Sequence, residues 1–211
     1  MKHRETGLLL TLVCVAVLVD GAGCTVGSGK GYVSGEVLIP DFKIDEKDFD
    51  LKIDTFMAAY ENKQLRIILQ RGGDLNVFSD GVFILVRDID KIKEKLDTPI
   101  EMVMFPTYEE YLDAGLEGDP PVPDPLLPVA VNLYLNRTCP DNHLGLTASE
   151  GSITFSSIFV PGEVDRIAGE FDFVFLDSRE WKSPEEPGPK AHLHGRFDFK
   201  YSRGQPAQPF P

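Results

Sequence analysis

Alternation of apolar and polar residues is the dominant pattern along this chain, and it predicts β-strands. In residues 49–54 each apolar side chain is followed by a charged one, which is typical of an antiparallel strand that buries one face. The same periodicity, with apolar residues at every second position, predicts further strands at 65–70, 82–86, 129–135 and 152–159.

Turn residues and one amphipathic segment interrupt these predicted strands. Glu-Asn-Lys at 61–63 and Ser-Asp-Gly at 79–81 indicate tight turns before two of the strands. Residues 88–96 are the one helix that the sequence predicts, because Asp88 can cap it and its apolar residues fall on one face. A proline-rich acidic segment at 106–128 is expected to form a loop.

The clearest pattern is a repeat near the C-terminus. Residues 167–175 and 193–201 both contain Gly-x-Phe-Asp-Phe. In a strand, the two Phe of each copy share one face and the Asp lies on the other. The two copies are therefore predicted to form a long hairpin joined by 177–191, in which the glycines mark a bulge or a bend.

Together these patterns predict an all-β fold. A single antiparallel domain is expected over residues 32–211, with about eight to ten strands and one short helix. Consecutive hairpins favour a meander. A barrel and a two-layer sandwich would produce the same alternation, so the sequence leaves both open.

The N-terminal segment has the features of a secretory signal peptide at residues 1–23. A basic start precedes an apolar run at 8–19, and small residues follow that run. The run is shorter than the roughly 20 residues that a spanning helix needs, so a cleaved signal is favoured over a permanent membrane anchor. No other part of the chain has an apolar run of that length.

Ala22-Gly23-Cys24 at the end of this segment predicts a lipid anchor on Cys24. Acylation, with palmitate or a similar chain, would make the membrane a partner of the protein, and the Gly- and Ser-rich residues 24–31 would form a flexible tether. Cys139 would then be a lone thiol. If Cys24 is not acylated, the protein is secreted, and a disulfide between Cys24 and Cys139 becomes an alternative.

The signal segment and the paired Gly-x-Phe-Asp-Phe strands resemble those of uncharacterised bacterial lipoproteins, which carry paired Gly-x-Phe-x-Phe strands near the C-terminus. The resemblance covers roughly the last 60 residues and the signal peptide. It implies a β fold and a location in the cell envelope, and it implies no activity.

Charge excludes one class of partner. The formal net charge is −13 at pH 7, which repels nucleic acid and bare anionic lipid. Neither nucleic acid nor a cofactor is expected to bind.

Few residues suggest chemistry. His192 and His194 alternate on the last strand and could present two imidazoles to a metal ion, but they would need further ligands. Cys139 and His143 lie four residues apart, and Pro140 prevents a regular helix between them. The chain contains no nucleophile elbow, phosphate-binding loop or zinc-protease motif. We therefore predict that the protein is not an enzyme.

Two functions follow as hypotheses. The first is a non-enzymatic binding or structural role in the cell envelope, with an unidentified protein or small-ligand partner. The alternative is a lipocalin-like carrier, in which Phe171, Phe173, Phe197 and Phe199 would line a cavity for an apolar ligand.

Overall fold

A computed structural model describes residues 29–72, 79–103, 127–139, 144–177 and 189–201 of the protein, and it confirms the predicted all-β class. The strands are β1 (Gly29–Ile39), β2 (Ile44–Leu51), β3 (Thr55–Glu61), β4 (Gln64–Gln70), β5 (Asp80–Val86), β6 (Ile100–Val103), β7 (Val129–Leu135), β8 (Gly145–Ser157), β9 (Arg166–Leu176) and β10 (Lys190–Lys200). One α-helix, α1 (Ile89–Lys93), and one 3₁₀ turn, η1 (Pro40–Phe42), complete the described elements. None of the described helices is long and apolar enough to cross a membrane.

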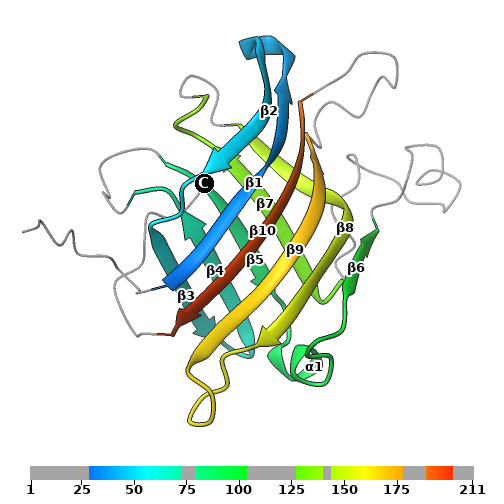
Figure 1. Ribbon diagram of the computed structural model, residues 1–211. Coiled ribbons are helices and arrows are strands. Elements are labelled where there is room, and N and C mark those ends of the chain that lie inside the picture. The colour runs from blue at the N-terminus through cyan, green and yellow to red at the C-terminus, as the bar shows by residue number, and fades with distance from the viewer. Residues whose placement is uncertain (1–28, 73–78, 104–126, 140–143, 178–188, 202–211) are drawn as a thin grey trace, which may run out of the picture.

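The strands form a single antiparallel sheet in the order β2-β1-β10-β9-β8-β7-β5-β4-β3. The remaining strand, β6, pairs with the edge of β8 that is not paired with β9. Most neighbours in the sheet are also neighbours in sequence, which confirms the predicted meander. The exceptions are β5 with β7, β6 with β8, and β1, which pairs with the last strand, β10, over nearly its full length. In Figure 1, β1, β10 and β9 therefore lie side by side and cross in front of β4, β5 and β7.

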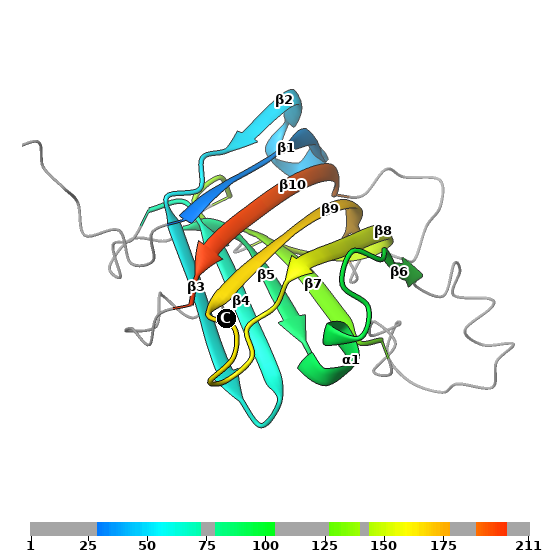
Figure 2. The same ribbon diagram turned by 60° about the horizontal axis from the view of Figure 1, so that its bottom comes forward.

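The sheet curls at β8, where one strand serves two layers. Residues 145–147 of β8 pair with β7, whereas residues 147–157 pair with β9. Just after the β7-paired residues, the ladder with β9 has a register shift between Ala148 and Glu150, and Gly151 follows it with φ 118°. Bulges and glycines of this kind let a strand turn a corner between crossed layers. Figure 2 shows the two layers separated on either side of this bend.

The barrel stays open between its two edge strands, β2 and β3. The sheet is a half-barrel, so the structure decides in favour of one curled sheet over two separate sheets. The ring of Phe56 on β3 lies across the opening. A Cβ added at Gly29 of β1 would lie 2.6 Å from its Cγ, and the ring also contacts Phe199 with centroids 5.7 Å apart. Side-chain packing, rather than a ladder of hydrogen bonds, therefore connects β3 to β1 and β10 across the opening.

Several local predictions are confirmed. The turn between β3 and β4 has Asn62 and Lys63 at φ 50° and 67°, the backbone of a tight hairpin. Asp88 caps α1 by accepting a hydrogen bond from the Asp90 amide, and the helix buries Ile89 and Ile92 as expected, although it ends at Lys93.

Other boundaries were wrong. The strand predicted at 49–54 is β2, which begins at Ile44 and ends at Leu51, because residues 52–54 cross from β2 to β3. The turn predicted at 79–81 belongs partly to β5, which starts at Asp80. The predicted tether includes residues 29–31, yet β1 begins at Gly29 and these residues pair with β10.

Three strands were not predicted at all: β1, β3 and β6. Their alternation is weak, because β1 contains glycines and β3 contains small residues and few charges. Residues 106–126 of the predicted proline-rich loop, most of the connection at 177–191, and residues 1–28 lie outside the described part of the chain.

The Gly-x-Phe-Asp-Phe repeat forms the predicted hairpin of β9 and β10, and its two copies are related by a pseudo-two-fold axis. Gly195 lies opposite Phe171, and Phe197 lies opposite Gly169. Each glycine therefore faces the aromatic ring of the other copy. A Cβ on Gly195 would lie 2.5 Å from Cζ of Phe171, and one on Gly169 would lie 3.0 Å from Cζ of Phe197.

The β9–β10 ladder runs in regular register through both glycines, so the predicted bulge is not between these two strands. A register shift does lie beside Gly169 on the other edge of β9, where Phe155 and Ser157 of β8 pair with Gly169 and Ala168. The glycines instead make room for rings, a packing that recovers the surface a strand glycine would leave uncovered. The interior that results is aromatic. Phe155, Phe173, Phe175 and Phe197 are among the largest fully buried side chains.

Candidate functional site

The outer face of β8, β9, β10 and β1 is the polar surface of the front layer. Because inward positions on β9 and β10 carry the Phe repeat, most of the alternating outward positions carry charged side chains or histidines, and β1 and β8 beside them add hydroxyl groups. His194 lies opposite both Ser34 and Asp172, and Arg196 lies opposite both Tyr32 and Glu170. The regular ladder beneath fixes the spacing of these groups.

The pseudo-two-fold relation of the hairpin extends to this outer face. Asp172 accepts a hydrogen bond from His192, with Oδ1 and Nε2 2.7 Å apart. In the other copy, Asp198 occupies the place of Asp172, and Arg166 donates to its Oδ1 from Nε at 2.7 Å. Hydrogen bonding from Arg166 lowers the pKa of the Asp198 carboxyl.

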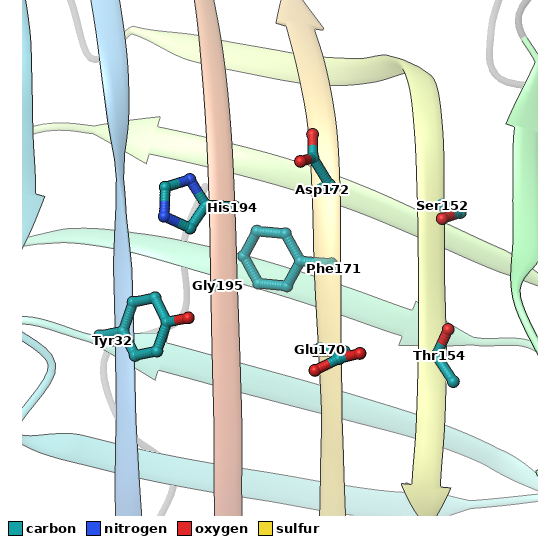
Figure 3. A pocket seen from close by; sticks show the side chains of 8 residues that line it. All are labelled: Tyr32, Ser152, Thr154, Glu170, Phe171, Asp172, His194 and Gly195. Atoms are coloured by element: carbon teal, nitrogen blue, oxygen red, sulfur yellow. The ribbon is translucent and has the colours of Figure 1, made fainter. Parts of the chain in front are cut away.

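A hollow of about 250 Å³ lies on this face between the two diagonal pairs. Figure 3 shows the side chains that border it, which come from four neighbouring strands. The lining residues are Tyr32 from β1, His194 and Gly195 from β10, Glu170, Phe171 and Asp172 from β9, and Ser152 and Thr154 from β8.

The base of the hollow is rigid because it is part of the Phe-packed hairpin. Gly195 has no side chain, and the buried Phe171 ring fills the space beneath it. At one side of the hollow, Tyr32 is 48% exposed, the most exposed large hydrophobic residue in the described part of the chain. Its ring meets the His194 imidazole edge-on, with centroids 5.9 Å apart.

Several polar groups around the hollow are available to a ligand. In the part of the chain that the structure describes, the side chains of Glu170, Ser152 and Thr154 make no hydrogen bond or ion pair with other residues. Asp172 uses Oδ1 for His192 and is 63% exposed. The hollow can thus donate from hydroxyl groups and accept on carboxylates without breaking existing contacts.

A serine and a histidine also lie close together near this hollow. Ser34 Oγ and His194 Nε2 are 3.1 Å apart, the pairing in which a histidine can activate a hydroxyl nucleophile. The carboxylate of Asp172 contacts His192 rather than His194. The third group of a catalytic triad, which would orient the imidazole, is therefore engaged elsewhere.

The predicted metal ligands lie where the alternation placed them, on the outer face of β10. His192 contacts Asp172, and His194 contacts Ser34. Among the described residues, no three His, Cys, Asp or Glu side chains are grouped so that they could hold a metal ion. A further ligand, which the two imidazoles would need, is therefore not found in the described part of the chain.

The four phenylalanines of the carrier hypothesis are at most 4% exposed and contact one another inside the half-barrel. Phe171 and Phe173 stack with centroids 5.6 Å apart, and Phe197 lies 6.5 Å from Phe199. Phe197 also meets Phe155. Such spacings are those of packed aromatic pairs, so these contacts support a role in the core.

A second polar cluster lies beside the third cysteine, Cys139, at the start of β5. Asp80, which is fully buried, accepts hydrogen bonds from the backbone amides of Arg137 and Thr138 at 2.8 and 3.0 Å. The Thr138 hydroxyl donates to the second carboxylate oxygen at 2.8 Å, and Arg71 lies 4.0 Å away. This carboxylate fixes the turn after β7.

Cys139 is a free, buried thiol beside this turn. Burial, with a smaller contribution from the charge of Asp80, raises its pKa to about 11. A thiol with so high a pKa is a weak nucleophile at neutral pH. The placement of His143 and Cys24 relative to Cys139 lies outside the described residues.

Sequence reasoning missed Tyr32 as a site residue. The surrounding Gly and Ser residues favoured a tether, which hid the strand. The sequence nevertheless contained a signal, the alternation of the apolar Val33 and Val37 with Tyr32 and Glu36, which precede them. In the structure the two valines are buried, whereas Tyr32 and Glu36 are not. An aromatic residue at a polar position of such a strand is a candidate for binding.

No protein-family model, no curated protein and no solved structure matches this chain.

Proposed function

We propose that this is an exported bacterial protein, anchored in the cell envelope through Cys24, that binds a polar ligand in the hollow beside Tyr32. The role is non-enzymatic. The observation that carries the binding proposal is the exposed Tyr32 ring next to unpaired polar side chains on a rigid sheet. The cleavage-site sequence Ala22-Gly23-Cys24 supports the envelope location.

Two features make this face suited to binding rather than to structure alone. An exposed aromatic ring can contribute strongly to association, because binding removes a large apolar area from water. A site built on paired strands is also held more firmly than one on loops. The Phe-lined inner face of the same hairpin provides that support.

The anchor is tested by intact-mass measurement of the mature protein from the native organism. We expect cleavage before Cys24 and an added acyl mass, together with recovery in the membrane fraction. Cys24→Ser should remove that mass and release the protein from membranes. A mature protein that begins elsewhere, or that carries an unmodified Cys24, would contradict the anchor.

The binding surface is tested separately by photo-crosslinking in the native organism. p-Benzoylphenylalanine is introduced at position 32, and at Val164 as a control, because Val164 is 36% exposed and does not border the hollow. We expect light-dependent adducts at position 32 and none at position 164. Equal labelling at both positions, or none at position 32, would contradict a ligand in the hollow.

A further inference from the structure

We infer that the ligand of this hollow is a neutral carbohydrate, with one sugar ring lying on the face of Tyr32. The inference rests on the proposed binding function and specifies its ligand class. It follows from three properties of the surface: an exposed aromatic ring, polar groups placed around it, and a balance of charge.

The aromatic ring provides an apolar platform. Nearly half of Tyr32 is open to solvent, and the His194 contact reaches the ring at an angle of 74°, in an edge-to-face arrangement. A pyranose has an apolar face of C–H groups and a rim of hydroxyls. Stacking that face on a tyrosine buries apolar surface on both sides while the hydroxyl rim stays at the level of neighbouring polar groups.

The polar groups match that rim. Glu170 and Asp172 can accept hydrogen bonds from hydroxyls, and the hydroxyls of Ser152 and Thr154 can donate or accept. Neighbouring strands are about 4.8 Å apart and alternate residues about 6.8 Å apart, a grid comparable to one sugar ring. The hollow, at about 250 Å³, is smaller than the usual range of roughly 300–1,000 Å³ for sites of drug-sized ligands. It fits one ring of a glycan.

The charge of this face favours a neutral ligand. Although the chain is strongly acidic, the outer face of β1, β10, β9 and β8 carries as many basic as acidic side chains. The basic residues are Lys30, Arg166, Lys190, Arg196 and Lys200, and the acidic residues are Glu36, Glu150, Glu170, Asp172 and Asp198. The side chains of these four strands therefore give no excess of either sign to attract an ion.

Ligands of either charge fit this surface less well. An anion would meet the carboxylates of Glu170 and Asp172 at the hollow itself. A cation could stack on Tyr32, but Arg196 lies directly opposite both Tyr32 and Glu170 in the strand register. A polyhydroxylated ring can use the guanidinium and the carboxylate together, because hydroxyls both donate and accept.

The test is a titration followed by ¹⁵N–¹H NMR of the mature protein carrying Cys24→Ser. The probes are the neutral hexasaccharides of cellulose, amylose and chitin, with spermine as the cationic probe and a galacturonate hexamer as the anionic one. We expect at least one neutral hexasaccharide to shift the amide resonances of β1, β9 and β10 around the hollow, and neither charged probe to do so.

Four variants separate the ring from its surroundings. Tyr32→Ala should weaken binding at least about tenfold, the effect of losing one stacking contact, whereas Tyr32→Phe should bind within about twofold of the wild type because it keeps the ring. Glu170→Gln should weaken binding, and Glu61→Gln, which changes an exposed carboxylate on β3 in the other layer, should not. Unchanged resonances away from the hollow show that each variant is folded.

Three results overturn the inference. If only a charged probe shifts the hollow resonances, the binding function stands and the ligand is an ion of that sign. If no probe shifts them while the crosslink at position 32 persists, the ligand is not a carbohydrate. Binding of a neutral hexasaccharide that is unaffected by Tyr32→Ala would also contradict the site. Failure of the crosslink as well would remove the proposed function itself.

Discussion

Gly195→Ala is expected to destabilise the protein although it adds a single methyl group to a strand. The new Cβ would lie 2.5 Å from Cζ and 2.7 Å from Cε1 of Phe171, and 3.0 Å from the carbonyl oxygen of Tyr32. Real Cβ atoms do not approach others so closely, and Phe171 is packed against Phe173. The ring must therefore move within a filled core.

Overpacking of this kind costs about 1–3 kcal/mol in the free energy of unfolding. For a chain of this size, that corresponds to a fall in Tm of roughly 2–12 °C. The matched control is Gly145→Ala in β8, where the nearest atom to an added Cβ is Tyr134 Cε1 at 3.4 Å. Because that contact is ordinary, Gly145→Ala should be neutral or should stabilise by up to about 1 kcal/mol.

A second substitution isolates the cause. Phe171→Leu removes the Cζ and Cε1 atoms that collide, so Gly195→Ala should cost much less when it is combined with Phe171→Leu. The Tyr32 carbonyl contact at 3.0 Å remains, and recovery should therefore be incomplete. Urea unfolding of the wild type, the two single variants and the double variant, all with residues 1–23 removed and Cys24→Ser, gives the coupling energy. Additive effects, or a Gly195→Ala variant as stable as Gly145→Ala, would refute the reciprocal Gly–Phe packing.

Three further predictions concern other parts of the molecule. Cys139 should react with a maleimide at pH 8 roughly 100-fold more slowly than free cysteine, because burial raises its pKa to about 11. Unfolding the protein in urea should restore the reaction rate. Fast labelling of the folded protein would contradict the burial of this thiol. Asp80→Asn should lower the free energy of unfolding by about 2–3 kcal/mol, since a buried acceptor of three hydrogen bonds loses its charge. The control Asp172→Asn, at an exposed site, should change the free energy of unfolding by less than about 0.5 kcal/mol. Equal effects of the two substitutions in urea unfolding would refute the role of Asp80 in fixing the turn. Because the pKa of Asp198 is lowered in the folded protein, its contribution to the free energy of unfolding is complete above the unfolded pKa of about 3.9 and is lost as the pH falls through the folded value. The stability difference between the wild type and Asp198→Asn should therefore be constant from about pH 5 to 8 and shrink by about pH 3. A difference that grows in acid would contradict this prediction.

The sequence predicted strands well where a strand has one solvent-exposed polar face and one buried apolar face. β7, β9 and β10 alternate cleanly, and the repeat predicted that β9 and β10 pair. β3 failed this test because its small residues give no contrast between faces, and β1 failed because its glycines imitate a linker. The purpose of those glycines is long-range: Gly29 and Gly31 accommodate Phe56 from another strand, which no local pattern can reveal.

The candidate site was less predictable than the fold. Alternation placed His192 and His194 on the outer face, but it could not show that they have different partners, since Asp172 and Ser34 come from different strands. The hollow needs four strands in register. Only the pairing of β1 with β10 brings Tyr32 onto the same face as Glu170, with Arg196 between them, and that pairing joins the two ends of the described chain.

The pairing of β1 with β10 also determines when the protein can fold. β1 has β2 on one side, but its other edge stays unpaired until the final strand is available. Contacts between segments so distant in sequence form slowly, because the loop-closure entropy must be overcome first. For a chain that passes through a translocation channel with its N-terminus first, this arrangement delays completion of the sheet until almost the whole polypeptide has emerged. Under the export proposed above, the topology itself would help to keep the chain unfolded until it has crossed the membrane.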